Sequence, residues 1–189
     1  MSNTAQDLLY RHRLTISDYH RMGEVGILHE DARVELIDGE LIDRAPIGSR
    51  HAGTVLQLSR VLIFAVGGRA YVSTQNPVLL GEHSEPQPDI ALLRPRDDFY
   101  KSTHPRPDDV LLIVEVADAS LRYDREIKIP LYARHGIPEV WLVDVENAQF
   151  SIFLTPGGQG YQDIRLRASL TAVAPSLLPD IFLDLSGLF

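Results

Sequence analysis

VLLIVEV, at residues 110–116, is the stretch of sequence that decides the fold. Its first five residues are all apolar, which is typical of a strand buried on both faces of a sheet. Glu115 interrupts the run between Val114 and Val116. A buried carboxylate costs several kcal/mol unless it is paired or binds a cation. The stretch therefore predicts a central strand whose acid either has a partner or lies at an exposed strand end.

Two helical segments and several β-like segments surround this strand. Apolar residues at helical spacing predict a helix over residues 51–66, ended by a Gly-Gly pair. A second helix is predicted over residues 124–135, where Pro130 must kink the helix or begin a new first turn. Further strands are expected at residues 70–73, 78–80, 90–93, 140–143, 150–154 and 162–166. This interleaving favours an α/β or α+β sandwich whose sheet is covered by helices.

The N-terminal part predicts a β-hairpin of its own. Residues 34–42 hold two apolar runs around an Asp-Gly pair, and both positions of such a turn favour positive φ. Upstream, the sequence TISD at residues 15–18 has the pattern of a capping box that opens a short helix over residues 19–22. We expect residues 1–13 to be an N-terminal extension that can be flexible. Residues 14–189 are expected to form a single domain.

Composition excludes several classes of protein. A chain of 189 residues with 44% hydrophobic and 23% charged residues can bury a sizeable core. The absence of cysteine excludes disulfides, thiolate metal sites and cysteine nucleophiles. No apolar run is long enough to span a bilayer, and residues 1–13 contain no signal-peptide core, so a cytoplasmic protein without a membrane partner is expected. The net charge of −8 argues against an architectural DNA binder, but it allows an enzyme that meets phosphate through a local basic patch and a cation.

Familiar catalytic motifs are missing from the sequence. There is no nucleophile elbow, P-loop, dinucleotide fingerprint or zinc-protease helix, and the seven histidines have no metal-ligand spacing. The glycine-rich residues 157–160 lie between two predicted strands with no helix after them. They are therefore predicted to be a hairpin loop rather than a phosphate loop.

Two carboxylates lie at positions that are difficult to explain structurally. Asp89 follows a proline and opens the apolar strand at residues 90–93, and Glu115 interrupts the central strand. A cation shared by two acids on neighbouring strands would offset the cost of burying them, and oxygen ligands favour Mg²⁺ or Mn²⁺. Taken singly, Asp89 is better explained as a polar strand-entry residue, and Glu115 is equally explained as an acid at an exposed strand end.

The helix predicted after the central strand adds a basic residue. Asp124, Lys128 and Tyr132 lie at i, i+4 and i+8, so they share one helix face. A lysine on that face can orient a water near a metal or stabilise charge that grows on a phosphate. The alternative is an ordinary surface pair of Asp124 and Lys128, worth roughly 0.3–0.5 kcal/mol.

The order of these residues resembles the PD-(D/E)XK restriction-endonuclease-like superfamily. A PD pair stands at residues 88–89, EVA follows at residues 115–117, and a lysine comes after it. More closely, the chain is similar to the Uma-type endonuclease branch, over nearly all residues after 14. The stretches that carry this resemblance are RVELIDGEL at 33–41, PDIA at 88–91, VEVADASLRYDREIK at 114–128, PLYAR at 130–134 and GIPEVWLVD at 136–144.

This resemblance implies a restriction-endonuclease-like α/β core, with a mixed central β-sheet flanked by helices and the N-terminal β-hairpin as an addition. It also implies metal-dependent hydrolysis of phosphodiester bonds in a nucleic acid, with DNA as the expected partner. Asp89 and Glu115 would hold Mg²⁺ (or Mn²⁺), and the backbone carbonyl of Val116 would add a ligand. The usual lysine of the superfamily falls on Ala117 here, so the role of positioning the attacking water passes to Lys128.

The same resemblance implies four auxiliary residues and leaves other functions open. Glu35 and Asp124 are auxiliary acids, and His51 and Tyr132 either line the site or serve packing and capping. The alternative functions are a catalytically silent fold used for binding or assembly, and a phosphoesterase that acts on a smaller substrate. Residues 177–189 form an apolar stretch that either closes the core or provides the face of a homodimer.

Overall fold

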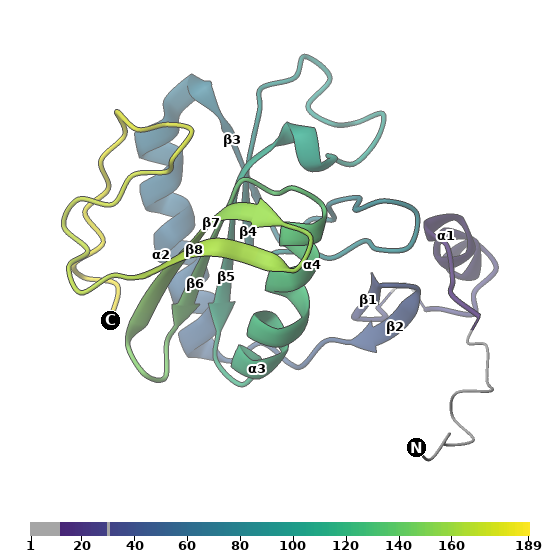
Figure 1. The fold of residues 1–189 in the computed structure, drawn as a ribbon. Helices are drawn as coiled ribbons and strands as arrows, with labels where there is room; N and C mark the ends of the chain where they lie inside the picture. The colour runs from purple at the N-terminus through teal and green to yellow at the C-terminus, as the bar shows by residue number, and fades with distance from the viewer. Residues whose placement is uncertain (1–11, 30) are drawn as a thin grey trace.

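The computed structural model describes residues 12–29 and 31–189, and its centre is a six-stranded β-sheet (Figure 1). The strand order is β3-β4-β5-β6-β7-β8. The strands are β3 (Tyr71–Thr74), β4 (Ile90–Leu93), β5 (Val110–Ala117), β6 (Glu139–Asp144), β7 (Gln149–Gly157) and β8 (Gly160–Leu166). All neighbours are antiparallel except β5 and β6, which are parallel. The mixed sheet implied by the sequence is therefore confirmed. Of the expected N-terminal extension, residues 1–11 lie outside the described part.

Strand β5 is buried along its whole length, as the apolar run predicted. Its parallel pairing with β6 requires a crossover, which a broken helical segment provides. The segment consists of α3 (Leu121–Tyr123), a π-helical turn (Asp124–Lys128) and α4 (Ile129–Arg134). The helix expected over residues 124–135 is therefore confirmed, with a π-helical turn that was not expected, and of the two roles expected for Pro130 the start of a new first turn is the one observed. Pro130 lies in the first turn of α4, because it has no N–H to continue the preceding turn.

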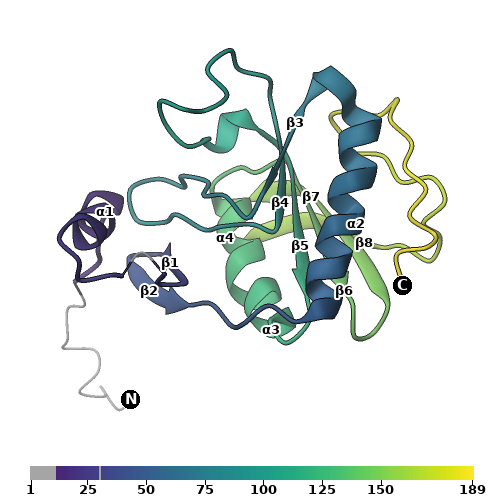
Figure 2. The same ribbon diagram turned by 180° about the vertical axis from the view of Figure 1, so that it is seen from behind.

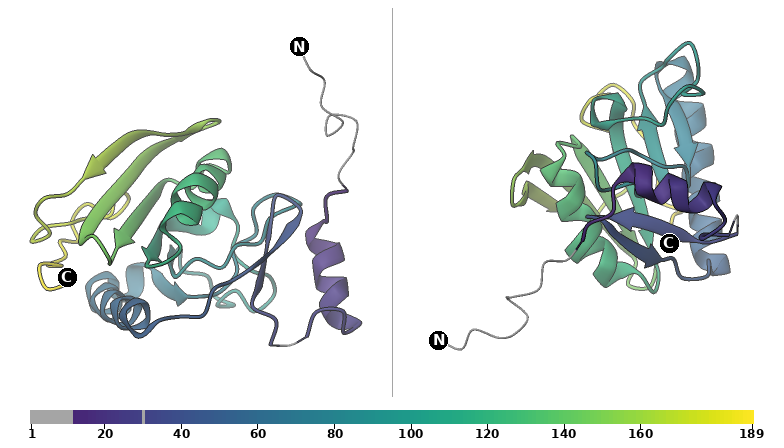
Figure 3. Two further views of the ribbon diagram at one scale, coloured as in Figure 1. Left: turned by 90° about the horizontal axis from the view of Figure 1, so that it is seen from below. Right: turned by 90° about the vertical axis from the view of Figure 1, so that its right-hand side faces the viewer.

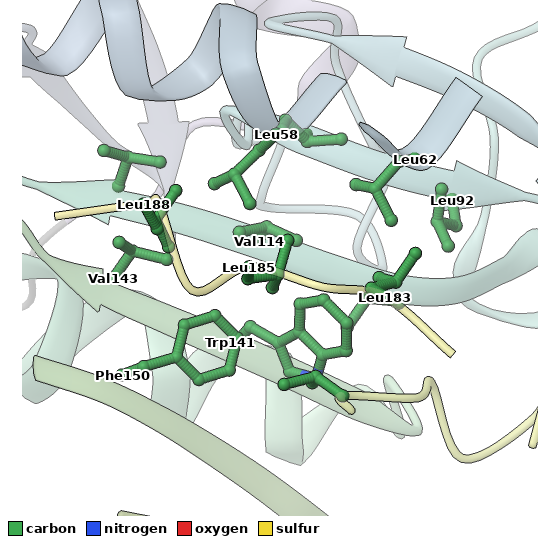
Figure 4. Packing of buried hydrophobic residues seen from close by; sticks show 14 of the residues in the cluster. Leu58, Leu62, Leu92, Val114, Trp141, Val143, Phe150, Leu183, Leu185 and Leu188 are labelled. Carbon is green, nitrogen blue, oxygen red and sulfur yellow. The ribbon is translucent and has the colours of Figure 1, made fainter. Parts of the chain in front are cut away.

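One face of the sheet packs against helix α2 (Ser49–Val66) and the C-terminal segment (Figure 2). Figure 4 shows Leu58 of α2 above the sheet residues Val114 and Trp141, with Leu185 of the C-terminal segment packed among them. Of the two roles expected for residues 177–189, the structure thus shows closure of the core. Phe182 is the large apolar side chain of this stretch that stays most exposed.

The other face of the sheet packs against α4. Ile113 and Ala117 of β5 share this second core with Leu131 and Tyr132 of α4. Side chains alternate between faces along a strand, so Glu115, which lies between Ile113 and Ala117, points to the α4 face as well. This alternation decides which helix supplies the partners of Glu115.

The predicted hairpin forms a separate two-stranded sheet from β1 (Val34–Ile37) and β2 (Glu40–Asp43). Asp38 and Gly39 have φ of 49° and 81°, as the Asp-Gly turn predicted. The capping box also forms, and it opens a helix longer than expected, α1 (Ile16–Glu24). Figures 1 and 3 show the hairpin and α1 at the end of the molecule opposite the C-terminal segment.

The strand predicted at residues 78–80 is not present. Leu80 makes only an isolated bridge with Ser84, because β3 and β5 already occupy both edges of β4. Val78 and Leu80 are nevertheless buried, so their apolar character reflects the packing of a loop. Residues 157–160 do form the predicted hairpin connection, between β7 and β8. In the part of the chain that the structure describes, no helix is both long and apolar enough to cross a membrane.

Candidate active site

The two acids singled out in the sequence meet where β4 begins and β5 ends. Ile90 pairs with Val114, so Asp89 and Glu115 are the next residues on these two antiparallel strands. Both side chains are buried, and the backbone N–H of Asp89 lies 3.4 Å from Oε2 of Glu115. The alternative of an exposed strand end does not hold for Glu115.

Lys128 and Tyr132 approach Glu115 from the helical segment above the sheet. The Lys128 Nζ atom lies 2.7 Å from Oε1 of Glu115, and the Tyr132 hydroxyl donates to the same oxygen at 2.5 Å. Asp124, on the same helical face, accepts a hydrogen bond of 2.6 Å from the Ser120 hydroxyl. Asp124 and Lys128 are both buried, so the alternative of an ordinary surface pair is excluded.

The lysine arrives on a different element from the one used in the superfamily pattern. Ala117 is fully buried two residues after Glu115, on the same face of β5. A lysine at that position would extend toward the helical segment, which is where Lys128 now lies. The π-helical turn ends at Lys128 and shifts the helix register there. Lys128 thus contacts Glu115 from the helical segment and not from β5.

Asp89 is held by a histidine and by the backbone of the central strand. His51 Nε2 lies 3.0 Å from Oδ2 of Asp89, and the N–H of Val116 donates to the same oxygen at 2.9 Å. Burial acts to raise the pKa of Asp89, but the hydrogen bond with His51 and the charge of Lys128 outweigh it and lower the pKa. In turn, this hydrogen bond raises the pKa of His51.

Glu35 comes from the hairpin and faces the same lysine. Its Oε1 lies 3.6 Å from Nζ of Lys128 and 3.6 Å from Nε of Arg44, and it accepts a hydrogen bond of 2.9 Å from the N–H of Gln87. The hairpin therefore places a third carboxylate beside Lys128, although it belongs to a separate sheet.

Several carboxylates share the single ammonium group of Lys128. Burial raises the pKa of Glu115 to about 8, with Asp124 and Asp89 adding to the rise and Lys128 opposing it. Burial also acts to lower the pKa of Lys128, but the carboxylates around it outweigh this effect and raise the pKa. The cluster therefore holds a permanently charged lysine and an excess of acid.

A cavity of about 250 Å³ opens onto this cluster between the hairpin, the start of α2 and the start of the helical segment. Predicted site residues line it, namely Glu35, His51, Asp89, Glu115, Asp124 and Lys128. Tyr132 is not part of the lining and lies against Glu115 instead. Arg33 and Arg44, which flank the two strands of the hairpin, also line the cavity and add positive charge to its wall.

The structure adds two site residues that the sequence did not indicate, Tyr123 and Arg44, and it shows a further feature of the predicted residue His51. The Tyr123 hydroxyl and Nδ1 of His51 are buried without a hydrogen-bond partner among the described residues, and both side chains line the cavity. Arg44 was missed as well, because only the fold of the hairpin brings it near Glu35. No sequence spacing links Tyr123 or Arg44 to the acids, so no signal was available for them.

Another buried glutamate shows what a purely structural acid looks like in this fold. Glu139 accepts a hydrogen bond of 2.5 Å from the Trp141 indole and one of 2.6 Å from the N–H of Ser176. It lies outside the cavity lining. Both of its oxygens have a short contact with a neutral donor, whereas Glu115 has a lysine and a tyrosine on one oxygen and a long contact on the other.

Comparisons with known proteins show what the chain is similar to in fold and in family. A crystal structure titled "a putative nuclease belonging to DUF820", from Anabaena variabilis ATCC 29413, is similar in fold, with a TM-score of 0.70 and 17% sequence identity. The similarity covers 93% of this chain and 97% of that chain. Comparison with curated proteins found no match. The model of the Uma2 family, described as "Putative restriction endonuclease", matches residues 16–186, and the chain therefore belongs to this family.

Proposed function

We propose that this protein is a metal-dependent endonuclease that hydrolyses phosphodiester bonds in nucleic acid, with DNA as the substrate. One observation carries the proposal: a buried lysine lies 2.7 Å from a carboxylate that is itself next to a second carboxylate at the floor of a cavity. Hydrolysis of a phosphodiester needs a positioned water and positive charge near the phosphate, and this set of groups can supply both.

The donor atoms at the cavity floor suit Mg²⁺ or Mn²⁺. Among the described residues, Oδ1 of Asp89 has a single contact of 3.4 Å, to the Gln75 side chain, and Oε2 of Glu115 has one of 3.4 Å, to the N–H of Asp89. Mg²⁺ is bound by one or two carboxylates, with waters and substrate phosphate completing its coordination. No group of three or more His, Cys, Asp or Glu side chains within the described residues is placed to hold a metal. The two-carboxylate set is therefore the candidate.

The backbone carbonyl of Val116 is a third candidate ligand. The N–H of Val116 donates to Asp89, which is beyond the last paired residue of β4. The N–H and C=O of one residue in a strand point to the same side, so the carbonyl of Val116 is directed toward Asp89 too. This orientation supports the ligand set expected for Asp89, Glu115 and Val116.

The bound metal would lower the pKa of a coordinated water and offset negative charge on the phosphate. Lys128 would orient the attacking water through its ammonium group, which its carboxylate neighbours keep charged. Glu35 would hold that ammonium group from the hairpin side, and Tyr132 would fix Oε1 of Glu115. His51 would keep Asp89 ionised and in place.

The substrate would enter past the rim of the cavity. Arg33 and Arg44 line the cavity, and Arg44 donates a hydrogen bond of 2.7 Å to the Gln87 side chain. The unpaired Tyr123 hydroxyl is a donor available to a phosphate oxygen. Two arginines of the helical segment are already paired: Arg122 with Glu126 at 3.0 Å and Arg134 with Asp38 at 2.6 Å.

Cleavage of supercoiled plasmid and of single-stranded DNA tests the proposal, with Mg²⁺, Mn²⁺ or EDTA in parallel. The variants are Asp89→Asn and Lys128→Met, which keep the size of each side chain. Glu139→Gln is a control that changes a buried acid outside the cavity. We expect metal-dependent cleavage by the wild type and the control, and a loss of about 10²-fold or more in the other two.

The other outcomes separate the alternative functions. If the folded wild type cuts neither DNA nor RNA but hydrolyses a small phosphodiester such as bis-p-nitrophenyl phosphate, the substrate assignment is wrong and the site is a phosphoesterase. If it is inert on all of these and Mg²⁺ does not raise the melting temperature, the fold is catalytically silent. If Asp89→Asn cleaves as fast as the wild type, the site assignment fails.

A further inference from the structure

The outer edge of β8 is a surface that the proposed nuclease function does not use. β8 is the last strand of the sheet, and Figure 3 shows it on the outside of the molecule. It is seven residues long and carries Ile164 and Leu166, which are 61% and 65% exposed. β3, the strand at the opposite edge, has four residues. A long edge with exposed aliphatic side chains is a template for pairing with another strand.

The backbone N–H and C=O groups of β8 point alternately toward β7 and away from it, and one hydrogen bond shows which residues point inward. The N–H of Arg167 donates to the carbonyl of Phe150 in β7 at 2.9 Å, so this residue points inward. Residues two apart along a strand point the same way, and Arg165 and Asp163 therefore also direct their N–H and C=O groups toward β7. Gln162, Ile164 and Leu166 direct theirs away from the sheet.

Charged residues stand on either side of Ile164, and their order is self-complementary. Asp163 and Arg165 flank Ile164 in the sequence and share one face of the strand, where Nη2 of Arg165 lies 2.5 Å from Oδ2 of Asp163 in the single chain, a pair that the two partners would exchange in a dimer. If a second copy of β8 runs antiparallel with Ile164 at the two-fold axis, Asp163 of each copy lies opposite Arg165 of the other. Charges on an edge strand usually prevent pairing, but opposite charges that face each other favour it.

We propose that β8 forms the interface of a homodimer in which two β8 strands pair antiparallel about Ile164 and join the two sheets into one. The outward groups of Ile164 then bond to the same residue of the second copy, and Gln162 bonds to Leu166. Asp163 and Arg165 fall at the positions without backbone bonds, where opposing side chains are closest. The direction of the backbone groups and the order of the charged residues along β8 thus favour the same register.

The apolar surface beside β8 agrees with this interface. Ile164 lies opposite Phe153 in the pairing of β7 and β8, so both point to the α4 face. On that face, a groove of about 420 Å³ runs between the helical segment and the strands β7 and β8, lined by Ile129, Phe153 and Tyr161 among others. A second copy of β8 would bring its own Ile164 and Leu166 to the mouth of this groove. The second copy therefore covers aliphatic side chains that are exposed in one chain alone.

Charge exchange tests the register as well as the dimer. Sedimentation equilibrium is measured over a concentration series that extends to the limit of solubility. The wild type is expected to approach twice the chain mass of 21.1 kDa. Asp163→Arg places arginine opposite arginine, and Arg165→Asp places aspartate opposite aspartate, so each variant alone is expected to be a monomer. The side chains are exposed, and circular dichroism checks that each variant is folded.

Two combinations are expected to restore the dimer. An equal mixture of Asp163→Arg and Arg165→Asp chains pairs opposite charges at both positions, and so does the double variant that carries both changes. Arg69→Asp is the control, since it removes an exposed arginine that pairs with Asp180 away from β8. Its association is expected to match that of the wild type.

Two results would overturn the proposal. One is a wild type that stays at the mass of a single chain at every concentration. The other is a dimer that persists in both single variants, which would place the interface elsewhere. None of these measurements depends on nuclease activity, so the proposed function stands or falls separately.

Discussion

The ammonium group of Lys128 lies 2.7 Å from Oε1 of Glu115, although the two residues belong to a helical segment and to the central strand. Ala117 occupies the place on the strand where a lysine would have reached the same region. The π-helical turn and the face of β5 that carries Glu115 together create this contact. The positive charge beside Glu115 therefore comes from the helical segment packed on the sheet and not from the sheet itself.

Moving the lysine back to the strand tests whether its position or only its charge matters. Lys128→Ala is expected to lower DNA cleavage by about 10²-fold or more, because the attacking water loses its positioning group. Adding Ala117→Lys to this variant is expected to restore part of the activity, because residue 117 is on the same face as Glu115. Cleavage rates are compared after circular dichroism has shown that both variants fold. Full activity of Lys128→Ala would remove the lysine from the mechanism.

The metal-free protein is expected to become less stable as the pH rises from 4.5 to about 8. Burial raises the pKa of Glu115 from 4.5 to about 8, so in this range the folded state binds a proton that the unfolded state releases. Each such proton lowers the free energy of unfolding by at most about 1.4 kcal/mol per pH unit. The raised pKa of His51 acts in the same direction above pH 6.5, because its contribution is lost as the pH passes through the folded value.

Melting temperatures in EDTA, measured across this pH range, check the expectation. Glu115→Gln cannot titrate, so it should lose the larger part of the pH dependence, whereas Glu139→Gln should keep it. Mg²⁺ requires the ionised carboxylate and should therefore stabilise the wild type more at high pH than at low pH. A flat profile in the wild type would show that Glu115 is ionised throughout.

Removal of the buried Tyr123 hydroxyl is expected to stabilise the fold and to reduce cleavage at the same time. An unpaired buried hydroxyl costs about 1–3 kcal/mol, so Tyr123→Phe is expected to stabilise the fold by about 1 kcal/mol. The same change should reduce cleavage if the hydroxyl donates to the substrate. Tyr161→Phe is the matched control, because its hydroxyl donates to the Ile137 carbonyl at 2.7 Å, away from the cavity. For Tyr161→Phe, urea unfolding should show a free energy of unfolding that is lower by about 1–2 kcal/mol, and cleavage should be unchanged.

If Tyr123→Phe destabilises the protein as much as Tyr161→Phe does, the hydroxyl of Tyr123 has a structural partner such as a bound water. The assignment of this hydroxyl to the substrate would then fail. A stabilised variant with unchanged cleavage would also remove Tyr123 from the site, and would leave only the cost of its burial.

Local sequence rules predicted the elements whose signal is contained in a few residues. The apolar run before Glu115 indicated a strand buried on both faces, and the Asp-Gly pair at residues 38–39 indicated the hairpin turn. Residues 78–80 have the same local character as a strand, but β4 had no free edge to pair with them. Strand pairing is a property of the whole sheet, which local propensity does not contain.

The candidate site was predictable to the extent that it follows strand order and helix spacing. Asp89 and Glu115 had to meet if their strands were neighbours, and Lys128 had to share a face with Tyr132. The π-helical turn could not be predicted, and neither could the place of Tyr123 in the cavity, because both depend on how the helical segment packs on the sheet. The resemblance to a family supplied the link between these residues that their spacing alone did not.

We expect the backbone geometry of the hairpin turn to affect the site. Alanine substitutions at two glycines, Gly39 and Gly53, test this expectation. Gly39 has a φ of 81°, and a Cβ there would lie 2.5 Å from Cβ of Arg13, so Gly39→Ala should distort the turn. Glu35 lies on the same hairpin and faces Lys128 at 3.6 Å. Cleavage is therefore expected to fall more than the stability of the fold, because the hairpin forms a sheet separate from the core strands.

Gly53→Ala is the matched control, since Gly53 lies inside α2 with nothing within 4 Å of an added Cβ. It should stabilise the protein by about 0.5–1 kcal/mol and leave cleavage unchanged. Urea unfolding and plasmid nicking on both variants separate the two effects. If Gly39→Ala cleaves like the wild type, the hairpin does not need its turn to hold Glu35 beside Lys128.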